Sequence, residues 1–557
     1  MEEKIKRRLL GWPCPCRRAC ISATFPHDAD VFRVVLLLIL CASLCTRTRA
    51  QSFQETLGLQ PTYLTLDQAV QKVMEKSLDV RIEWLNWAIA EQQTNSALGK
   101  FEPAFFLTST WRESNLPQNA LEYVQTGGTI VALQDPRLFQ QQSLLSQAGI
   151  TGKLPTGLEY KIFASAGEFR NDLNRQRPPA IFYPEYAAAV GASVTQPLLR
   201  DFGPAVSLAE VRVSRRNAAI ADAKWELQFQ RSLSQVIVEY FDLIFALENI
   251  EVKREVVAFA QTLVIENQKR LGVGVLSAAD VQEAEVAVAV AREEVISALS
   301  LVVEKQMTLK TQILGSLEEG GGMVFLPKDS LPFIAPPTDR IQHLRNALQR
   351  RPDHRAAIEE AEKQAIIVKY ARNQLLPRLD LQATLTANGL AGGRGDAFGS
   401  AFQRQGYDTQ VGFQFTIPLG NRTAKANSNA AEYRQQQAIL NIARSELSIS
   451  VELDSVIARV RSARARMEST RESARLAERL LETEQKRLQE GLARSFDVLK
   501  ARTSLADAST RQIAAHADYN KAATQLQLVT GTLLERYGIR IDRGKNQLQS
   551  VQEVKSK

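Results

Sequence analysis

The chain has 557 residues, of which 45% are apolar and 23% are charged. This composition is typical of a folded protein and argues against intrinsic disorder. The formal net charge is +8, but the first 50 residues carry nine basic and four acidic side chains, and the remainder has 60 and 57. Nucleic-acid binding therefore loses its main support.

Residues 1–50 have the pattern of a secretory signal peptide. A basic region is followed by an apolar run from Val34 to Cys45 and by the small-residue site Thr48-Arg49-Ala50. An apolar run of about twelve residues is too short for a permanent anchor. All five cysteines lie in this segment, and the leucines before Cys41 and Cys45 argue against lipidation. A cysteine-free remainder suits an oxidising compartment.

A first helix is predicted from Leu64 to about Lys100, with Thr65 or Asp67 as its N-cap. After it the sequence turns to strand character, with a Pro-Thr-Gly turn between the second and third strands. The predicted strands are Ala104–Trp111, Ser146–Leu154, Leu158–Ala164 and Tyr186–Thr195. Gln196-Pro197-Leu198-Leu199 then leads into a helical region.

The next two helices are unusually long. Apolar residues recur at a stride of seven between Val206 and Leu271 and again between Ser277 and Leu314, as in a coiled coil. About 65 residues make a rod of roughly 100 Å. The seam residues are Val236, Leu243, Ile250, Val257, Val264 and Leu271, then Val281, Val288, Val295, Val302 and Leu309.

Residues 316–337 are rich in glycine and proline and are predicted to be a connector, after which the same design repeats. A helix over 339–376 ends at Pro377, and strands follow at Arg378–Thr386 and Tyr407–Ile417. The segment between these strands is expected to be an exposed loop. Pro418 opens a second long helix with the seam Leu453, Val460, Met467, Ala474, Leu481 and Leu488, and a return helix runs to about Tyr537.

The two long helical hairpins match at their tips. Gln-Lys-Arg-Leu-x-x-Gly-x₅-Asp-Val-x-x-Ala begins at Gln268 and again at Gln485. An internal duplication is therefore predicted. It gives a first repeat at 51–315, the connector, a second repeat at 338–541 and a tail at 542–557.

Each tip has residues suited to a tight turn between helices. Gly274 and Gly491 permit a left-handed backbone at the helix ends. Ser277 and Ser495 are the expected N-caps of the returning helices, and Asp280 and Asp497 fall in the first turns, where a carboxylate suits the helix dipole. Capping is one role for the two aspartates, and contact with a partner is a second, compatible one.

The predicted strands alternate apolar and polar residues as transmembrane barrel strands do. A half-exposed sheet of a soluble protein would alternate similarly, but the long rods and the signal peptide favour the barrel. Two or three strands per repeat cannot close a barrel, since about eight are needed. Closure therefore implies an oligomer.

The chain resembles the TolC-like outer-membrane efflux proteins over about residues 62–537. The resemblance rests on the order of several short motifs and on the duplication. The motifs are Leu64-Thr65-Leu66-Asp67-Gln68-Ala69, Gln196-Pro197-Leu198-Leu199, Glu239-Tyr240-Phe241-Asp242-Leu243, the Gly274/Asp280 and Gly491/Asp497 tips, Leu375-Leu376-Pro377, and Ile417-Pro418-Leu419.

The resemblance implies a mainly α-helical fold in which long antiparallel helices form a periplasmic α-barrel below an outer-membrane β-barrel. It implies a homotrimer in which each chain gives four strands to a twelve-stranded barrel. This chain has an insertion across about 112–166. We expect the Ser146–Ala164 hairpin to lie outside the barrel; the alternative is a different strand count.

The resemblance also implies a function: passive export through an outer-membrane duct that serves a tripartite efflux or type I secretion system. The partners would be a periplasmic adaptor, which docks at Gly274, Asp280, Gly491 and Asp497, and an inner-membrane transporter of the RND or ABC type. By the same resemblance, a closed periplasmic aperture is expected at Glu484, Arg487, Glu490 and Arg494, where ordinary solvated helix charges are the competing interpretation. Pro197, Pro377 and Pro418 would mark the helix–strand junctions.

Enzyme function is not predicted. After residue 50 the sequence has three isolated histidines, expected at the surface, no cysteine, and no Gly-x-Ser-x-Gly or His-Glu-x-x-His motif. No cofactor or metal site is expected. The competing class of function is a secreted periplasmic coiled-coil scaffold without a pore. The sequence does not indicate the exported substrate.

Overall fold

The computed structural model describes residues 60–118, 122–126, 128–133, 137–171, 181–315, 323–333, 339–403, 406–542 and 547–550. The predicted signal peptide, parts of the predicted connector and most of the predicted tail lie outside these residues. The chain divides into a small unit, Met1–Thr62 with Gly320–Leu326, and a large unit, Tyr63–Glu319 with Pro327–Lys557. Strands β1 (Gln60–Leu64) and β8 (Met323–Pro327) form a two-stranded sheet.

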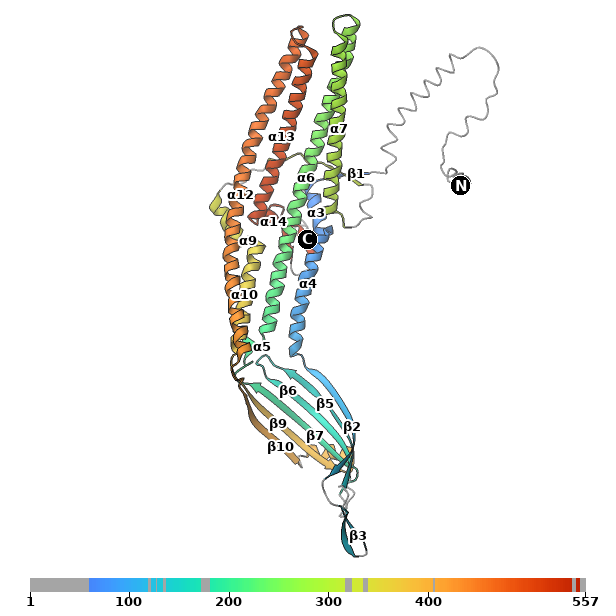
Figure 1. The fold of residues 1–557 in the computed structure, drawn as a ribbon, viewed down its shortest axis with the longest axis vertical. Coiled ribbons are helices and arrows are strands. Elements are labelled where there is room, and N and C mark those ends of the chain that lie inside the picture. The colour runs from blue at the N-terminus through green and yellow to red at the C-terminus, as the bar shows by residue number, and fades with distance from the viewer. Residues whose placement is uncertain are drawn as a thin grey trace, which may run out of the picture. The chain divides into compact units, whose positions relative to one another are not determined.

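The large unit contains two copies of one helical plan (Figure 1). The first copy has α3 (Leu66–Lys76), α4 (Leu78–Leu98), α5 (Pro204–Ser207), α6 (Ala209–Gly272) and α7 (Ala278–Ile313). The second has α9 (Arg340–Arg350), α10 (Pro352–Asn373), α12 (Arg422–Gln489) and α13 (Ser495–Val529), followed by α14 (Leu533–Arg536) and the hairpin β11 (Ile539–Asp542) and β12 (Gln547–Ser550). The predicted long helical hairpins and the duplication are both present.

Each repeat has a helix break that the sequence analysis missed. The predicted helix 64–100 is interrupted at Ser77, and the predicted helix 339–376 is interrupted at Arg351. Arg351 precedes Pro352, and a residue before proline is pushed out of the helical region; its φ and ψ are −68° and 126°. Thr65 caps the first helix in a capping box with Gln68, as predicted.

Helix α6 occupies the middle of the helical layer. It packs against α7 and α13 and against α4 and α10, while α12 packs against α13 and α10. The order is therefore α7, α6, α13, α12 toward the tips and α4, α6, α10, α12 toward the sheet. Helices α4 and α7 lie on one margin of this layer, and α12 lies on the other.

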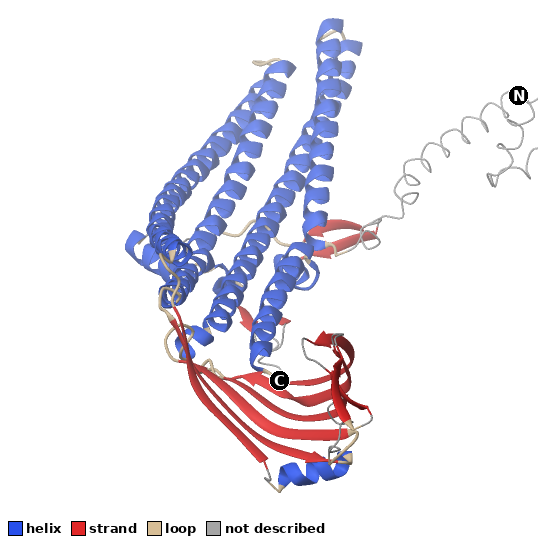
Figure 2. Cartoon of the chain, turned by 60° about the horizontal axis from the view of Figure 1, so that its bottom comes forward, coloured by secondary structure: helices blue, strands red, loops and turns tan. Residues whose placement is uncertain are grey.

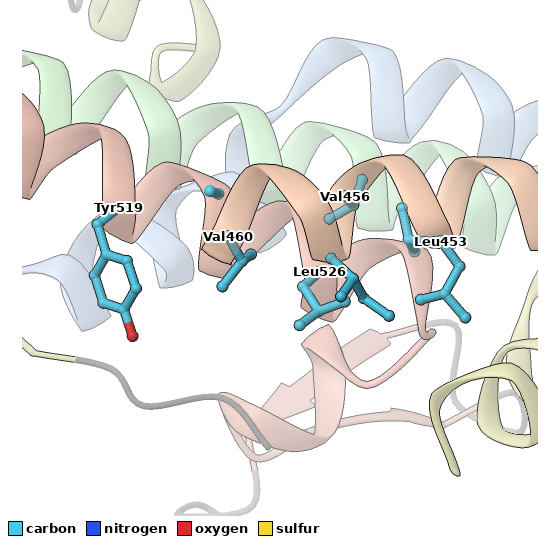
Figure 3. Close-up of a cluster of buried hydrophobic side chains, with 8 residues drawn as sticks. Leu453, Val456, Val460, Tyr519 and Leu526 are labelled. Atoms are coloured by element: carbon cyan, nitrogen blue, oxygen red, sulfur yellow. The ribbon is translucent and has the colours of Figure 1, made fainter. Parts of the chain in front are cut away.

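The predicted seams form the contacts between the long helices. Val236 and Leu243 of α6 are fully buried, and so is Leu453 of α12. Figure 3 shows Leu453, Val456 and Val460 of α12 in one buried cluster with Tyr519 and Leu526 of α13. Towards the tips the seam continues through Leu481 of α12 and Val498 of α13. The stride of seven keeps each seam against its partner over the whole hairpin.

The large unit also has a six-stranded antiparallel sheet, in the order β10-β9-β7-β6-β5-β2 (Figure 2). Its strands are β2 (Ala104–Gln118), β5 (Arg137–Lys153), β6 (Glu159–Asn171), β7 (Glu185–Pro197), β9 (Arg378–Ala391) and β10 (Gly406–Thr416). Each predicted strand is present, and most are longer than predicted. A separate short hairpin, β3 (Glu122–Thr126) and β4 (Thr129–Leu133), was not predicted.

The position expected for the inserted hairpin is wrong. Strands β5 and β6 lie inside the sheet, between β2 and β7, rather than outside it. Strand β5 pairs with β2 from Thr151 to Arg137, and β6 pairs with β7 from Glu159 to Phe169. Sequence spacing alone does not distinguish a hairpin added beside a sheet from one inserted into it, because both alternate with the same period.

The glycine-rich segment after Thr386 is also more ordered than expected. Strand β9 continues to Ala391, and α11 (Arg394–Phe402) then packs on β9 and β7. A Cβ on Gly389 would lie 1.9 Å from the carbonyl oxygen of Ala397, so only glycine allows this close approach. Ala188, Ala391 and Ala397 form a small buried cluster there.

None of the helices in the described part of the chain combines the length and the apolar character of a membrane span.

Tyr240 provides a test of how α6 holds the start of the first repeat. Its side chain is fully buried, and its hydroxyl lies 2.9 Å from the carbonyl oxygen of Leu64 and 3.0 Å from Oδ2 of Asp329. Tyr240→Phe should lower the free energy of unfolding by about 0.5–1.5 kcal/mol, because the buried carbonyl oxygen of Leu64 loses one of its two donors and keeps only the backbone N–H of Lys328. The matched control is Tyr63→Phe, since Tyr63 is 66% exposed. Equal thermal unfolding of the two variants would contradict this role.

Candidate functional site

The two helical hairpins end in turns of the same geometry. Gly274 in the first tip and Gly491 in the second both have φ of +75°, which only glycine adopts readily. Gly274 N donates to Leu271 O at 2.9 Å, and Gly491 N donates to Leu488 O at 3.2 Å. Both glycines therefore terminate their helices in the left-handed conformation.

The two returning helices are capped differently. In the first tip Ser277 is the N-cap, and Ser277 and Asp280 each bond the other's backbone N–H, at 3.0 Å and 3.3 Å. In the second tip the N-cap residue is Arg494, whose backbone N–H donates to Asp497 Oδ2 at 3.0 Å. The prediction that Ser495 is the N-cap is therefore wrong. The motif alignment that relates the tips already pairs Ser277 with Arg494.

A buried hydrogen-bonded pair joins the two tips. The Ser495 hydroxyl donates to Asn267 Oδ1 at 2.8 Å, and Asn267 Nδ2 donates to the backbone carbonyl of Asp280 at 3.3 Å. Asn267 is 1% exposed and Ser495 is 7% exposed. Asn267 thus connects the end of α6, the start of α7 and the start of α13.

Asn267 was not predicted as a site residue, although the sequence carries a signal for it. Asn267 follows the buried residues Val256, Ala260 and Leu263 at helical spacing, so it continues their inward-facing stripe. A polar side chain at such a position needs a hydrogen-bond partner. The aligned position in the second repeat is Glu484, so this is also a place where the two repeats differ.

The tips enclose a hollow of about 500 Å³ that is lined by residues of both hairpins. Arg270, Asp280 and Arg494 contribute charged groups to it. The hydroxyl and the backbone N–H of Ser277 hold the pKa of Asp280 below the ordinary aspartate value, and the charge of Arg494 acts in the same direction. Of the predicted docking residues, Asp280 and Gly491 line this hollow, one from each repeat, whereas Gly274 and Asp497 do not.

The four predicted aperture residues lie on either side of the second turn. Glu484 pairs with Arg487 one helical turn further along α12, at 2.8 Å. Glu490 is the C-cap of α12, and Arg494 is the N-cap of α13. The Glu484 side chain is 14% exposed, and its Oε2 is buried without a hydrogen-bond partner among the residues that the structure describes.

The three predicted junction prolines lie where helices and strands meet. Pro197 is the last residue of β7, Pro377 directly precedes β9, and Pro418 comes just after β10. Asn373 ties the junctions of the two repeats together, because its Oδ1 accepts from the backbone N–H of Asp201 at 2.8 Å and its Nδ2 donates to Leu199 O at 3.2 Å. The sequence analysis did not identify Asn373.

The histidines offer no metal site in the described residues. No group of three His, Cys, Asp or Glu side chains there is placed to hold a metal ion. His343 and His354 are each 6% exposed, so the expectation that they lie at the surface is wrong. Burial lowers the pKa of His516.

Comparison with known proteins gives a consistent result. Residues 343–532 match the model of the outer membrane efflux protein family. No curated protein sequence matches the chain significantly. Among solved structures, the CmeC outer membrane channel of Campylobacter jejuni aligns with a TM-score of 0.60 at 15% identity over 88% of each chain.

Two further channels align almost as well. The outer membrane protein VceC of Vibrio cholerae has a TM-score of 0.59 at 17% identity, covering 84% of this chain and 96% of its own. The MtrE outer membrane channel of Neisseria gonorrhoeae, in its open state, has a TM-score of 0.58 at 16% identity over 84% and 89%. These matches confirm the predicted fold class.

The family match thus covers the second repeat, and the fold shared with these outer membrane proteins extends over both repeats.

Asn267→Ala should loosen the two tips. The substitution leaves the Ser495 hydroxyl without its buried acceptor and removes a donor from the Asp280 carbonyl, so it should cost about 1–3 kcal/mol locally. Hydrogen exchange should accelerate over residues 271–280 and 488–498 together. Gln268→Ala is the matched control because Gln268 is the exposed neighbour. Acceleration confined to the first tip would show that Asn267 does not couple the pair.

The first tip should also depend on acidity. A carboxylate whose folded pKa is lowered stabilises the fold above its unfolded pKa, and that contribution is lost as the pH falls through the folded value. Hydrogen-exchange protection at 273–281 should therefore decline as the pH falls below about 3.9, the ordinary aspartate value. Asp280→Asn should remove most of this dependence. An unchanged pH profile in that variant would rule out Asp280 as its cause.

Proposed function

We propose that the protein is the exit duct of a tripartite efflux or type I secretion system. It would conduct substrates passively from an inner-membrane transporter and its adaptor across the periplasm and the outer membrane. The observation that carries the proposal is that the two margins of the helical layer correspond to the two edges of the sheet. Helices α4 and α7 and strand β2 lie on one margin, which we call the β2 margin; α12 and β10 lie on the other, the β10 margin.

Both margins have apolar side chains that no part of the described chain covers. On α4, Leu78, Ile82, Leu85 and Ile89 form a stripe at helical spacing, each between 51% and 56% exposed. On α12, Leu440, Leu447 and Val451 are between 61% and 69% exposed. Such stripes are typical of surfaces that another chain covers. Packing the β2 margin of one copy against the β10 margin of the next would close a ring, and the family resemblance favours three copies.

The sheet supports a place in the outer membrane. Its strands present one mainly apolar face and one mainly polar face, as lipid outside and water inside a barrel require. On β10, Val411, Phe413 and Phe415 are between 59% and 70% exposed. A periplasmic scaffold without a pore has no use for this apolar face, so the alternative function is less well supported.

The tips are the proposed docking surface for the adaptor. Their turns expose Val273, Val275 and Leu492 by 75%, 71% and 66%, beside Asp280 and Arg494. Small exposed apolar groups next to fixed charges suit a protein partner rather than a small ligand. No nucleic-acid partner is proposed, because the sequence after residue 50 is nearly neutral.

The aperture is proposed to lie beside the docking surface. The Glu484 carboxylate is largely buried and is paired with Arg487 within its own helix. In a ring, these residues of neighbouring copies would approach one another at the periplasmic end. An adaptor that binds the tips would therefore act next to these charged groups.

Fractionation and reconstitution test the proposal. The full-length protein should be recovered with the outer membrane, should require detergent for extraction and should migrate as a trimer on unheated gels. In a planar bilayer the trimer should give a small, mostly closed conductance. A periplasmic protein that is soluble without detergent and shows no conductance would support the scaffold instead.

A further inference from the structure

The hairpin β5–β6 distinguishes this chain from the four-strand contribution that the family resemblance implies. Its two strands are paired along their length with β2, with β7 and with each other. A hairpin that lay outside the sheet would lose the strand pairing between β2 and β5 and between β6 and β7. The pairing therefore makes β5 and β6 part of the same continuous sheet as the other four strands.

Close to the turn between β5 and β6, the two faces of the sheet keep the character that they have on the neighbouring strands. One residue from each strand forms a row across the sheet, and adjacent rows point to opposite faces. An apolar row is Phe105, Ile150, Ile162, Ala192, Leu385 and Thr409. The next row, on the polar face, is Ala104, Thr151, Lys161, Ser193, Thr384 and Gln410. The inserted strands thus contribute isoleucines to the face that the neighbouring strands also make apolar.

On the polar face, aromatic rings cover two glycines of the sheet. The Phe106 ring of β2 lies over Gly149 of β5, where a Cβ would come within 2.9 Å of it. The Phe163 ring also lies over Gly191 of β7, 3.0 Å from where a Cβ would be. Aromatic side chains that cover glycines on neighbouring strands stabilise curved sheets.

The same face is hollowed. A cavity of about 470 Å³ lies on it, with Leu145, Ser165 and Phe169 of the hairpin beside Ala189 and Asn388 of the neighbouring strands. The polar face therefore has a hollow at this place. Hairpin residues line this hollow together with residues of both repeats.

The width of the sheet also fits the helical layer. Four helices, α4, α6, α10 and α12, lie side by side next to it. At 8–10 Å between axes, they span roughly 30–40 Å. Six strands about 4.8 Å apart and tilted by 35–45° span roughly 35–41 Å, whereas four would span roughly 23–27 Å.

We propose that β5 and β6 are wall strands, so that three copies close an eighteen-stranded barrel in which β2 of one copy pairs with β10 of the next. The proposal rests on the proposed function. The partner is a second copy of this chain, because an unpaired strand edge is too costly in lipid and the helical margins lead to the same two edges. Barrel diameter grows about linearly with strand number, so the exit would be roughly 1.5 times as wide as a twelve-stranded one.

Site-directed fluorescence tests the proposal on the protein in lipid vesicles after removal of residues 1–50, the predicted signal peptide. The sequence has no cysteine after residue 45, so single cysteines can be labelled with bimane. Ile162→Cys on the apolar face of β6 should be quenched by nitroxide lipids, and Ser165→Cys on the polar face should be quenched by iodide. The matched pair outside the hairpin is Val411→Cys and Gln410→Cys on β10. Single cysteines scanned along β2, each combined with Gln410→Cys, should give disulfide-linked trimers.

The Val411→Cys and Gln410→Cys pair on β10 distinguishes failure of this inference from failure of the proposed function. Lipid quenching at both Ile162→Cys and Val411→Cys, with β2–β10 crosslinks, would support the wider barrel. Lipid quenching at Val411→Cys alone would leave the channel intact but would place the hairpin outside the wall and overturn the inference. Quenching by lipid at neither position would overturn both the inference and the proposed function.

Discussion

The structure depends on one helix. The buried seam of α6 contacts α7 and α13 toward the tips and α4 and α10 toward the sheet, so both repeats pack on it. Coiled-coil packing at a stride of seven fixes how these rods lie along one another. Because α6 lies in the middle, the remaining elements fall into two margins, and the strands that follow or precede the marginal helices become the two edges of the sheet. The two margins that we propose to join in a ring thus follow from the packing of a single chain.

The duplication explains the common plan, and the differences between the repeats mark where the two halves have specialised. The turns keep the same glycine geometry, but Ser277 caps one helix where Arg494 stands in the other. Asn267 reaches across to Ser495, whereas the aligned Glu484 is paired with Arg487 in its own helix. The first repeat also carries the additional pair of strands. One tip residue therefore links the hairpins, while its counterpart supplies a charge near the proposed aperture.

Much of this fold was predictable because its signals are periodic. The stride of seven located the long helices, and the alternation of apolar and polar residues located every strand of the six-stranded sheet. The helix break before Pro352, the partners of Asn267 and the place of the β5–β6 hairpin were not predicted. The helix break could have been predicted, because a residue that precedes a proline is disfavoured in a helix. The other two depend on contacts between segments far apart in the sequence, since strand order and a single buried hydrogen bond leave no periodic trace. The loop expected after Thr386 was misjudged because glycine there serves close packing under α11 rather than flexibility.

Electron cryo-microscopy of the detergent-extracted protein tests most directly whether copies of this chain join through the two margins. Three copies should form one ring, with α12 of each against α4 and α7 of the next. The membrane end should show eighteen strands, with β5 and β6 in the wall. A single chain, or a ring of three whose wall has twelve strands and leaves β5 and β6 outside, would contradict this account.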